Sequence, residues 1–294
     1  MPARLSFAER RTRTHRALGL PDEAGFPILM SVLNVTPDSF SDGGHFTTID
    51  AIRAQCQHFA KHESAIIDIG GESTRPGSDP VSIEAEWARV KDAISIAKRE
   101  TALLVSIDTQ KAEIARRALA EGADIVNDVS GLGDPGMPKV VADAQCPTIV
   151  MHMRGLPKTM QEGPIIYEDL CTDISAHLRT SMERGIQAGL EPEKLIVDPG
   201  IGFGKTLEHN LILTRELHRF HDLGAPILYG PSRKRFLGAL TDKEAPDRDV
   251  ATAAVIALGI EFGADIVRVH NPQISSDALK VAGALAALGG SLPS

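Results

Sequence analysis

Eight short apolar segments recur along the chain, and this repeat limits the possible folds more than any other feature. They lie at residues 28–35, 65–71, 102–108, 123–129, 147–153, 194–200, 225–232 and 264–271. Each is rich in Val, Ile and Leu without strict alternation, as is typical of strands covered on both faces of a parallel sheet. The intervening residues 49–62, 84–100, 111–122 and 249–263 have apolar positions at helical spacing. Eight successive strand–helix units predict an α/β fold, the (β/α)8 barrel.

The repeat also predicts the domain organisation. We expect a single barrel domain over residues 28–294, in which residues 272–294 form the closing helix and tail. Residues 1–27 are rich in arginine and are expected to form a solvated N-terminal arm; a transit peptide is the alternative interpretation. A doubly wound open sheet is the alternative fold, because GIGFG at 200–204 superficially resembles a dinucleotide-binding turn. Its glycine spacing is not G-x-G-x-x-G, which argues against that fold.

Composition excludes several classes of function. The net charge of −8 argues against a general nucleic-acid surface, so any anion site must be built locally. No stretch approaches the roughly 18 apolar residues of a membrane span. Cys56, Cys146 and Cys171 are widely spaced and lack metal-binding motifs, which indicates free thiols in a reducing compartment. We therefore expect a cytoplasmic protein that acts on small molecules.

Polar residues end every one of the eight apolar segments. They are Asn34, Asp68 with Glu72, Asp108, Asn127, His152, Asp198, Ser232 with Lys234, and Arg268 with His270. A single such residue is usually a turn former or a helix cap. A complete ring of them at the end of a barrel where polar groups lose hydration is typical of an active site.

The ring divides into two kinds of chemistry. Asp108, Asn127 and Asp198 can pair with a planar heterocycle that carries adjacent N–H donors. Cationic or anion-seeking side chains form the second group, which predicts a phosphate-bearing ligand; they are Arg75, Arg233, Lys234, Arg268 and His270. The loops at 36–44 and 72–80 are polar enough to close over such a ligand. From the residues alone, we expect an enzyme that joins a heterocycle to a second substrate and releases phosphate.

At this point the motifs become specific, and the chain resembles the dihydropteroate synthases, a family of pterin-binding barrels. The resemblance runs from about residue 28 to residue 271. It is carried by LNVTPDSFSDGG (33–44), DIGGESTRPG (68–77), SIDT (106–109), GADIVNDVSG (122–131), MHMRGLPKTMQ (151–161), DPGIGFGK (198–205), GPSRKRF (230–236) and IVRVH (266–270).

The resemblance implies a reaction and a role for each matching residue. These enzymes condense 6-hydroxymethyl-7,8-dihydropterin diphosphate with 4-aminobenzoate in folate biosynthesis, with Mg²⁺, and are usually homodimers. The matching pterin positions are Asp108, Asn127, Met151, Asp198, Phe203 and Lys234; the diphosphate positions are Asn34, Thr74, Arg75, Arg268 and His270. The aminobenzoate positions are Phe40, Pro76, Ser232 and Lys234, and Asn34 is the expected metal ligand. Asp108, Asp198, Lys234 and Arg268 are the expected catalytic residues.

Two positions depart from the usual family pattern. Asn271 stands where many members carry Asp, so a carboxylate that could orient Arg268 or a neighbouring loop is missing. Arg154 stands where glutamine is common, and it could face either solvent or ligand. Two other functions compete with the synthase: a methyltetrahydrofolate:corrinoid methyltransferase, which would have no reason to keep STRPG, SRK and RVH together, and a non-enzymatic paralogue, for which degenerate strand ends would be expected.

Overall fold

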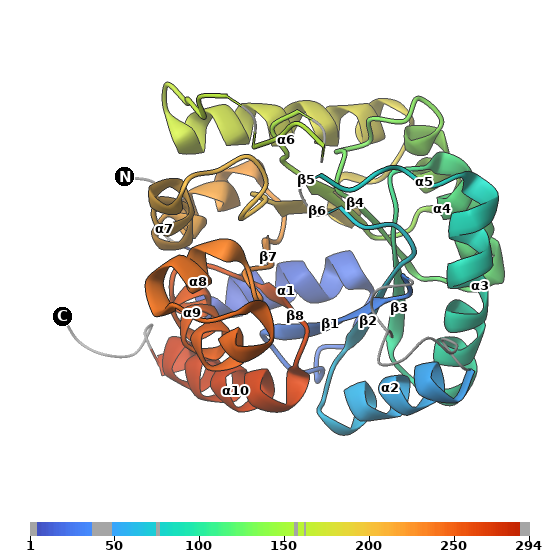
Figure 1. Ribbon diagram of the computed structural model, residues 1–294, viewed down its shortest axis with the longest axis horizontal. Helices are drawn as coiled ribbons and strands as arrows, with labels where there is room; N and C mark the ends of the chain where they lie inside the picture. The colour runs from blue at the N-terminus through green and yellow to red at the C-terminus, as the bar shows by residue number, and fades with distance from the viewer. Residues whose placement is uncertain (1–4, 37–48, 75–76, 156–157, 162, 289–294) are drawn as a thin grey trace.

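Eight parallel strands form the centre of the molecule and confirm the predicted (β/α)8 barrel (Figure 1). This computed structural model describes residues 5–36, 49–74, 77–155, 158–161 and 163–288. The strands are β1 (Ile28–Asn34), β2 (Ile66–Gly70), β3 (Leu104–Asp108), β4 (Ile125–Asp128), β5 (Thr148–Met151), β6 (Leu195–Asp198), β7 (Leu228–Tyr229) and β8 (Ile266–Val269). β1 pairs with both β2 and β8, the last strand among the described residues, which excludes the open-sheet alternative.

The barrel is closed by a narrow seam between β6 and β7. Only an isolated bridge, Val197 to Ile227, joins these two strands among the described residues, and the Val197 amide donates to the Pro226 carbonyl at 2.9 Å. The Ile227 amide is bound by a side chain instead, the carboxylate of Asp265, at 2.8 Å. A side-chain carboxylate therefore satisfies a backbone donor beside this seam.

Helices surround the strands and bury one apolar face each (Figure 1). They are α2 (Ile49–Lys61), α3 (Ile83–Glu100), α4 (Ala112–Glu121), α5 (Met137–Ala144), α6 (Leu170–Gln187), α7 (Leu207–Arg215), α8 (Arg235–Thr241), α9 (Asp249–Glu261) and α10 (Pro272–Leu288), with 3-10 turns η2 (Pro192–Lys194), η3 (Leu217–Leu223) and η4 (Ala245–Arg248). The four helices predicted between strands are confirmed. Gly122 ends α4 in the left-handed conformation, which glycine adopts without a steric cost.

The N-terminal arm differs from the prediction, because residues 7–18 form a helix that packs on the barrel rather than a solvated arm. This helix, α1 (Phe7–Leu18), begins with a capping box between Ser6 and Glu9 and is seen through the ring of strands in Figure 1. Ala17 and Leu18 join the apolar cluster inside the barrel. Arg10 is buried and its Nε donates to Asp265 Oδ1 at 2.8 Å, so α1 is fixed to the residue before β8.

Candidate active site

Strand alternation explains why polar side chains meet inside the barrel. The apolar layer within the strands consists of Met30, Ile66, Ile125, Ile149, Ile196, Leu228 and Ile266. Because side chains on one face of a strand recur every second residue, the residues two positions later face the same interior. Those residues are Val32, Asp68, Asn127, Met151, Asp198, Gly230 and Arg268. Two residues after this apolar layer, the strands therefore present the polar side chains Asp68, Asn127, Asp198 and Arg268 to the barrel interior.

An arginine and two carboxylates form the centre of this site. Arg268 Nε donates to Asp68 Oδ2 at 2.6 Å, and Arg268 Nη2 donates to Asp108 Oδ2 at 2.7 Å. The Asn127 amide nitrogen also donates to Asp68 Oδ2, at 3.1 Å. Within the described part of the chain, Asp68 Oδ1 and Asp108 Oδ1 are buried and have no hydrogen-bond partner. Buried acceptors of this kind are ready to receive ligand N–H groups.

The charges of the site shift its protonation equilibria. Burial and, to a smaller extent, the neighbouring Asp68 raise the pKa of the Asp108 carboxyl to about 7, and Arg268 opposes the shift. Burial likewise raises the pKa of Asp198, which Lys234 and the Gly200 N–H oppose. Burial lowers the pKa of Lys234 to about 7 against the attraction of Asp198. Perturbed groups of opposite charge in one pocket are typical of a functional site.

Phe203 and Lys234 form an aromatic and cationic wall of the site. The Lys234 ammonium lies 4.1 Å from the centre of the Phe203 ring and donates to the Ile201 carbonyl. Gly202 has a φ of +83°, and a Cβ at this position would lie 2.8 Å from Lys234 Cδ, so only glycine fits this turn. Met151 packs in the same apolar cluster as Phe203.

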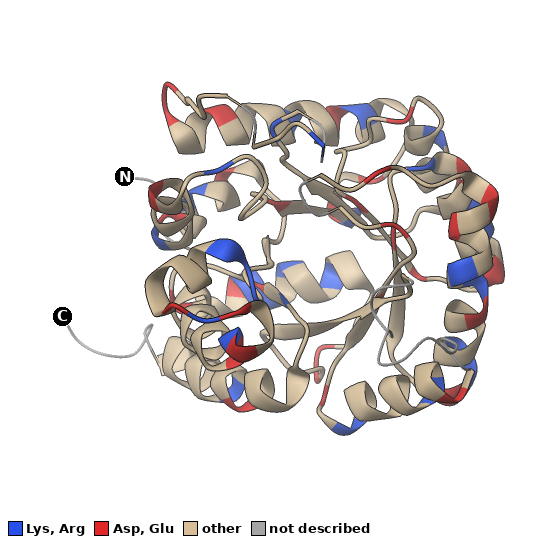
Figure 2. Cartoon of the chain, viewed as in Figure 1, with Lys and Arg blue, Asp and Glu red and all other residues tan. Residues whose placement is uncertain are grey.

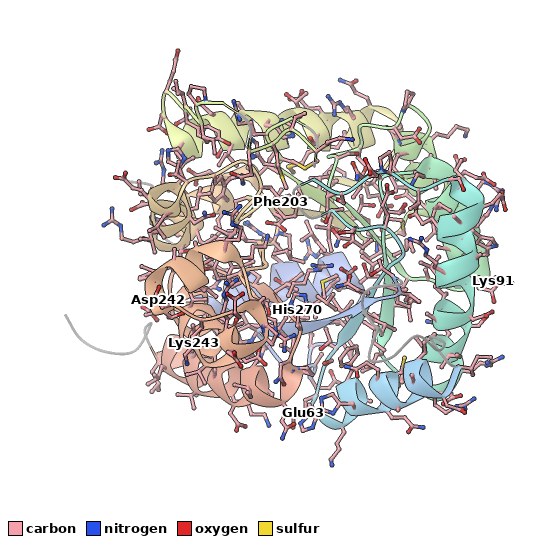
Figure 3. All side chains as sticks on the ribbon, viewed as in Figure 1. Glu63, Lys91, Phe203, Asp242, Lys243 and His270 are labelled. Carbon is pink, nitrogen blue, oxygen red and sulfur yellow. The ribbon has the colours of Figure 1, made fainter. Side chains whose placement is uncertain are left out.

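Hydrogen bonds join the segments that follow β7 and β8. His270 Nδ1 lies 3.0 Å from Ser232 Oγ, and the His270 amide donates to the same hydroxyl at 3.1 Å. Figure 3 shows Phe203 and His270 toward the middle of the molecule, inside the ring of helices, whereas Glu63 and Lys91 lie at the rim.

Of the remaining predicted site residues, the structure describes three and leaves three outside the described residues. Asn34 ends β1, and Thr74 is half-buried on the loop after β2. Phe40, Arg75 and Pro76 lie outside the described residues, so their predicted roles stay predictions. Arg233 differs from the expectation of a cation facing the ligand, because Asp249 binds its guanidinium through two hydrogen bonds of 2.7 and 2.9 Å.

Asn271 and Arg154, the two residues that depart from the usual family pattern, each form hydrogen bonds with nearby residues. The Asn271 amide donates to Asp249 Oδ2 at 2.8 Å and so supports the Arg233 turn, while Arg268 is oriented by Asp68 and Asp108 instead. Arg154 is half-buried, and its guanidinium donates to the carbonyls of Met160 and Pro164 at 3.3 and 3.0 Å. It therefore binds its own loop.

One buried pair next to Phe203, Lys205 with His152, was not predicted from the sequence. Lys205 Nζ lies 2.9 Å from His152 Nδ1 and donates to the Phe203 carbonyl at 3.0 Å, which fixes the turn that carries the Phe203 ring. Burial lowers the pKa of the Lys205 ammonium well below its usual value. His152 is a strand-end residue, but nothing in the spacing of the sequence indicates that a lysine after a later strand reaches it.

Comparisons with known proteins agree with this geometry. The sequence pattern of the family described as "Pterin binding enzyme" matches residues 30–270. The chain is 43% identical over 259 residues to the dihydropteroate synthase of Synechocystis sp., covering 87% of this chain and 89% of that protein. It is 40% identical over 266 residues to the enzyme of Escherichia coli K12, covering 90% and 94%.

Solved structures give the same result. The Yersinia pestis dihydropteroate synthase with a sulfonamide drug complex superposes with a TM-score of 0.84 at 38% identity, covering 88% of this chain and 94% of that one. The Xanthomonas albilineans enzyme with 4-aminobenzoic acid superposes with a TM-score of 0.83 at 40% identity, covering 91% and 94%. Among the residues that the structure describes, no helix is long and apolar enough to cross a membrane.

Proposed function

We propose a role for each residue of the site on one premise: the chain belongs to the pterin-binding enzyme family, and within it to the dihydropteroate synthases. It is a transferase of folate biosynthesis that condenses 6-hydroxymethyl-7,8-dihydropterin diphosphate with 4-aminobenzoate to give 7,8-dihydropteroate and diphosphate. The competing methyltransferase and non-enzymatic interpretations are thereby set aside.

The pterin is held by Asp108, Asn127, Asp198 and Lys234. The observation that carries this assignment is the buried Asp108 Oδ1, which has no hydrogen-bond partner among the described residues and needs an N–H donor; Asp108 is aligned with Asn127 on the neighbouring strand. The amino-pyrimidine edge of a pterin supplies such donors, and Asn127 can both donate and accept. Met151 and the Phe203 ring pack against the flat faces of the heterocycle, since both lie in one apolar cluster beside Lys234.

The diphosphate is bound by the cations and hydroxyls at the mouth. Arg268 uses two of its five N–H groups on Asp68 and Asp108, which leaves three for phosphate oxygens. His270 follows the end of β8, two residues after Arg268. Thr74 and Arg75 complete the diphosphate site from the loop after β2.

A magnesium ion fits this arrangement as a partner of the diphosphate. A Cβ on Gly70 would lie 3.6 Å from Asn34 Oδ1 and 3.7 Å from Asp108 Oδ2, and because glycine has no side chain this space between two oxygens stays open. The described residues contain no group of three or more His, Cys, Asp or Glu side chains arranged for a metal. Mg²⁺ usually takes few protein ligands and several phosphate oxygens, so Asn34 suffices as the protein ligand. When bound, it would neutralise charge on the leaving group.

The chain's own residues then drive a substitution at the pterin methylene carbon. The C–O bond to the diphosphate breaks, and the electron pair leaves with the diphosphate, whose charge Arg268 and His270 neutralise. The Asp108 and Asp198 carboxylates stabilise the cation that forms on the dihydropterin. The neutral amine of 4-aminobenzoate attacks this carbon, the C–N bond forms, and the nitrogen releases a proton to solvent. No protein nucleophile is required.

The second substrate binds above the pterin. Ser232 and Lys234 face it from the loop after β7, and Ser232 is fixed there by the two contacts with His270. Phe40 and Pro76 shape the rest of its site, with Phe40 as an aromatic wall for the benzoate ring.

The enzyme acts as a cytoplasmic homodimer in this proposal. The helices α8, α9 and α10 carry few charges and are tan along most of their length in Figure 2. Exposed apolar side chains on two of these helices support a self-association surface; they are Val250, Leu258, Val281, Leu285 and Leu288. Cys56, Cys146 and Cys171 are buried and free, which suits a reducing compartment.

Calorimetry tests the assignment of the two substrate sites. We expect 4-aminobenzoate to bind only when the pterin pocket and diphosphate site are filled, because the bound pterin and the diphosphate complete its site. Titration of 4-aminobenzoate into the protein should give heat with 6-hydroxymethylpterin and diphosphate present and none without them. Tight binding to the empty protein, or diphosphate release that does not require both substrates, would contradict the proposal.

A further inference from the structure

Asp68 is a buried carboxylate at the centre of the site that the reaction described above does not use. Its side chain is fully buried on β2. One oxygen, Oδ2, accepts from Arg268 Nε at 2.6 Å and from the Asn127 amide at 3.1 Å. A single atom therefore joins the arginine assigned to the diphosphate to the amide assigned to the pterin.

The strand register explains why Asp68 can make both contacts. On β2, Asp68 is aligned with Ser106 of β3, and Gly70 is aligned with Asp108. Asp108 therefore lies two residues further along its strand than the residue aligned with Asp68. Arg268 reaches it from β8, the strand on the other side of β1. The Asp68 carboxylate thus joins Arg268 on β8 and Asn127 on β4, each of which lies two strands away from β2.

The charges indicate why this position holds a carboxylate. Arg268 lies between two anions, with Nε on Asp68 and Nη2 on Asp108. When the Asp108 carboxylate binds the pterin, the Asp68 carboxylate still neutralises the positive charge of Arg268 and fixes the plane of its guanidinium. Without the Asp68 charge, Asp108 would be the only carboxylate bound to Arg268, and the pterin would have to compete with that ion pair.

We propose that Asp68 is a positioning residue that fixes Arg268 and Asn127 relative to each other, so that the pterin and the diphosphate of one substrate molecule are held at a set distance. This inference rests on the proposed roles of those two residues. Asp68 contacts no reacting atom in it. Its effect on the reaction passes through Arg268 and Asn127.

The test uses Asp68→Asn, which conserves volume and removes the charge. We expect kcat/KM for the dihydropterin diphosphate to fall about 100-fold, as misplacement of a binding group by about 1 Å does. The KM for 4-aminobenzoate should stay within about threefold, and the Tm should not fall. Ser106→Ala is the matched control, because Ser106 is buried and aligned with Asp68 but its hydroxyl has no hydrogen-bond partner among the described residues.

A double-variant cycle separates positioning from a general structural role. In an Arg268→Gln background, Asp68→Asn should cost less than about threefold, because the main group that it positions is already gone. Two results would overturn the role of Asp68 but not the proposed function. In one, the losses of kcat/KM multiply in the double variant; in the other, kcat/KM of Asp68→Asn stays within threefold of the wild type. If the wild-type protein does not release diphosphate from both substrates, the proposed function itself fails.

Discussion

Among single residues, Lys234 couples the site to pH. Burial lowers the pKa of its ammonium to about 7, with Arg268 adding to the shift and Asp198 opposing it. Below pH 7 both the folded and the unfolded chain carry this proton, and between about pH 7 and 10.5 only the unfolded chain keeps it. The unfolded state then binds more protons, so this residue makes the free energy of unfolding rise with pH in that window, by at most about 1.4 kcal/mol per unit.

Urea titrations at pH 7, 8 and 9 measure this contribution. Relative to the wild type, Lys234→Met should show a smaller rise of unfolding free energy with pH. The exposed Lys91→Met is the matched control and should keep the wild-type slope. Equal slopes in all three proteins would show that Lys234 does not titrate in this range.

At the scale of elements, α9 holds the turn that carries Ser232 and Lys234. Arg233 in this turn has a φ of +59°, a conformation that costs a non-glycine residue about 1 kcal/mol or more. Asp249 at the start of α9 binds its guanidinium, and Thr252 Oγ accepts from its amide at 3.1 Å. The strained turn is therefore maintained by a helix that carries none of the proposed substrate-binding residues.

Asp249→Ala should release this turn and raise the KM for 4-aminobenzoate roughly tenfold, an effect of about 1.4 kcal/mol. The KM for the pterin substrate should rise less, because only Lys234 of its four binding residues lies on this turn, whereas Asp108, Asn127 and Asp198 lie on β3, β4 and β6. Steady-state kinetics with each substrate varied in turn measure the difference, with the exposed Asp247→Ala as control. Equal effects on both KM values would argue against a local role.

The first helix is held by a buried ion pair rather than by a large apolar face. Arg10→Met should lower the free energy of unfolding by about 3–5 kcal/mol, because Asp265 is left buried without its guanidinium. Chemical denaturation compares it with Arg11→Met, whose side chain is exposed on the same helix. A loss no larger than that of the control would mean that α1 contributes little to the barrel.

For the whole molecule, the apolar helices α9 and α10 give an expectation about assembly. Val281 and Leu285 are each 62% exposed, and charged replacements there should break an apolar interface. Sedimentation should show a dimer for the wild type and a monomer for the Val281→Glu, Leu285→Glu double variant. Ile186→Glu, on α6, should remain dimeric. A wild-type monomer at micromolar concentration would exclude the homodimer.

The arrangement of strands was predictable because apolar runs and their polar ends repeat eight times, and alternation then places Asp108, Asn127, Asp198 and Arg268 in one interior. Two features were not predictable. The buried face of α1 includes Arg10, Thr14 and His15, which read as solvated residues in a sequence. The contact between Asp68 and Arg268 depends on side-chain rotamers of residues 200 positions apart.

The salt bridge between Arg10 of α1 and Asp265 also has a consequence for folding during synthesis of the chain. Arg10 precedes its partner by 255 positions, and Ala17 and Leu18 pack against a cluster that includes Leu228 and Ile266. At about 5–20 residues per second, the ribosome delivers that partner roughly 10–50 s after the helix. Although α1 is made before the eight strands, it is consequently among the last of the described elements to dock, and until then its apolar side chains stay exposed. Refolding of the finished chain has no such delay.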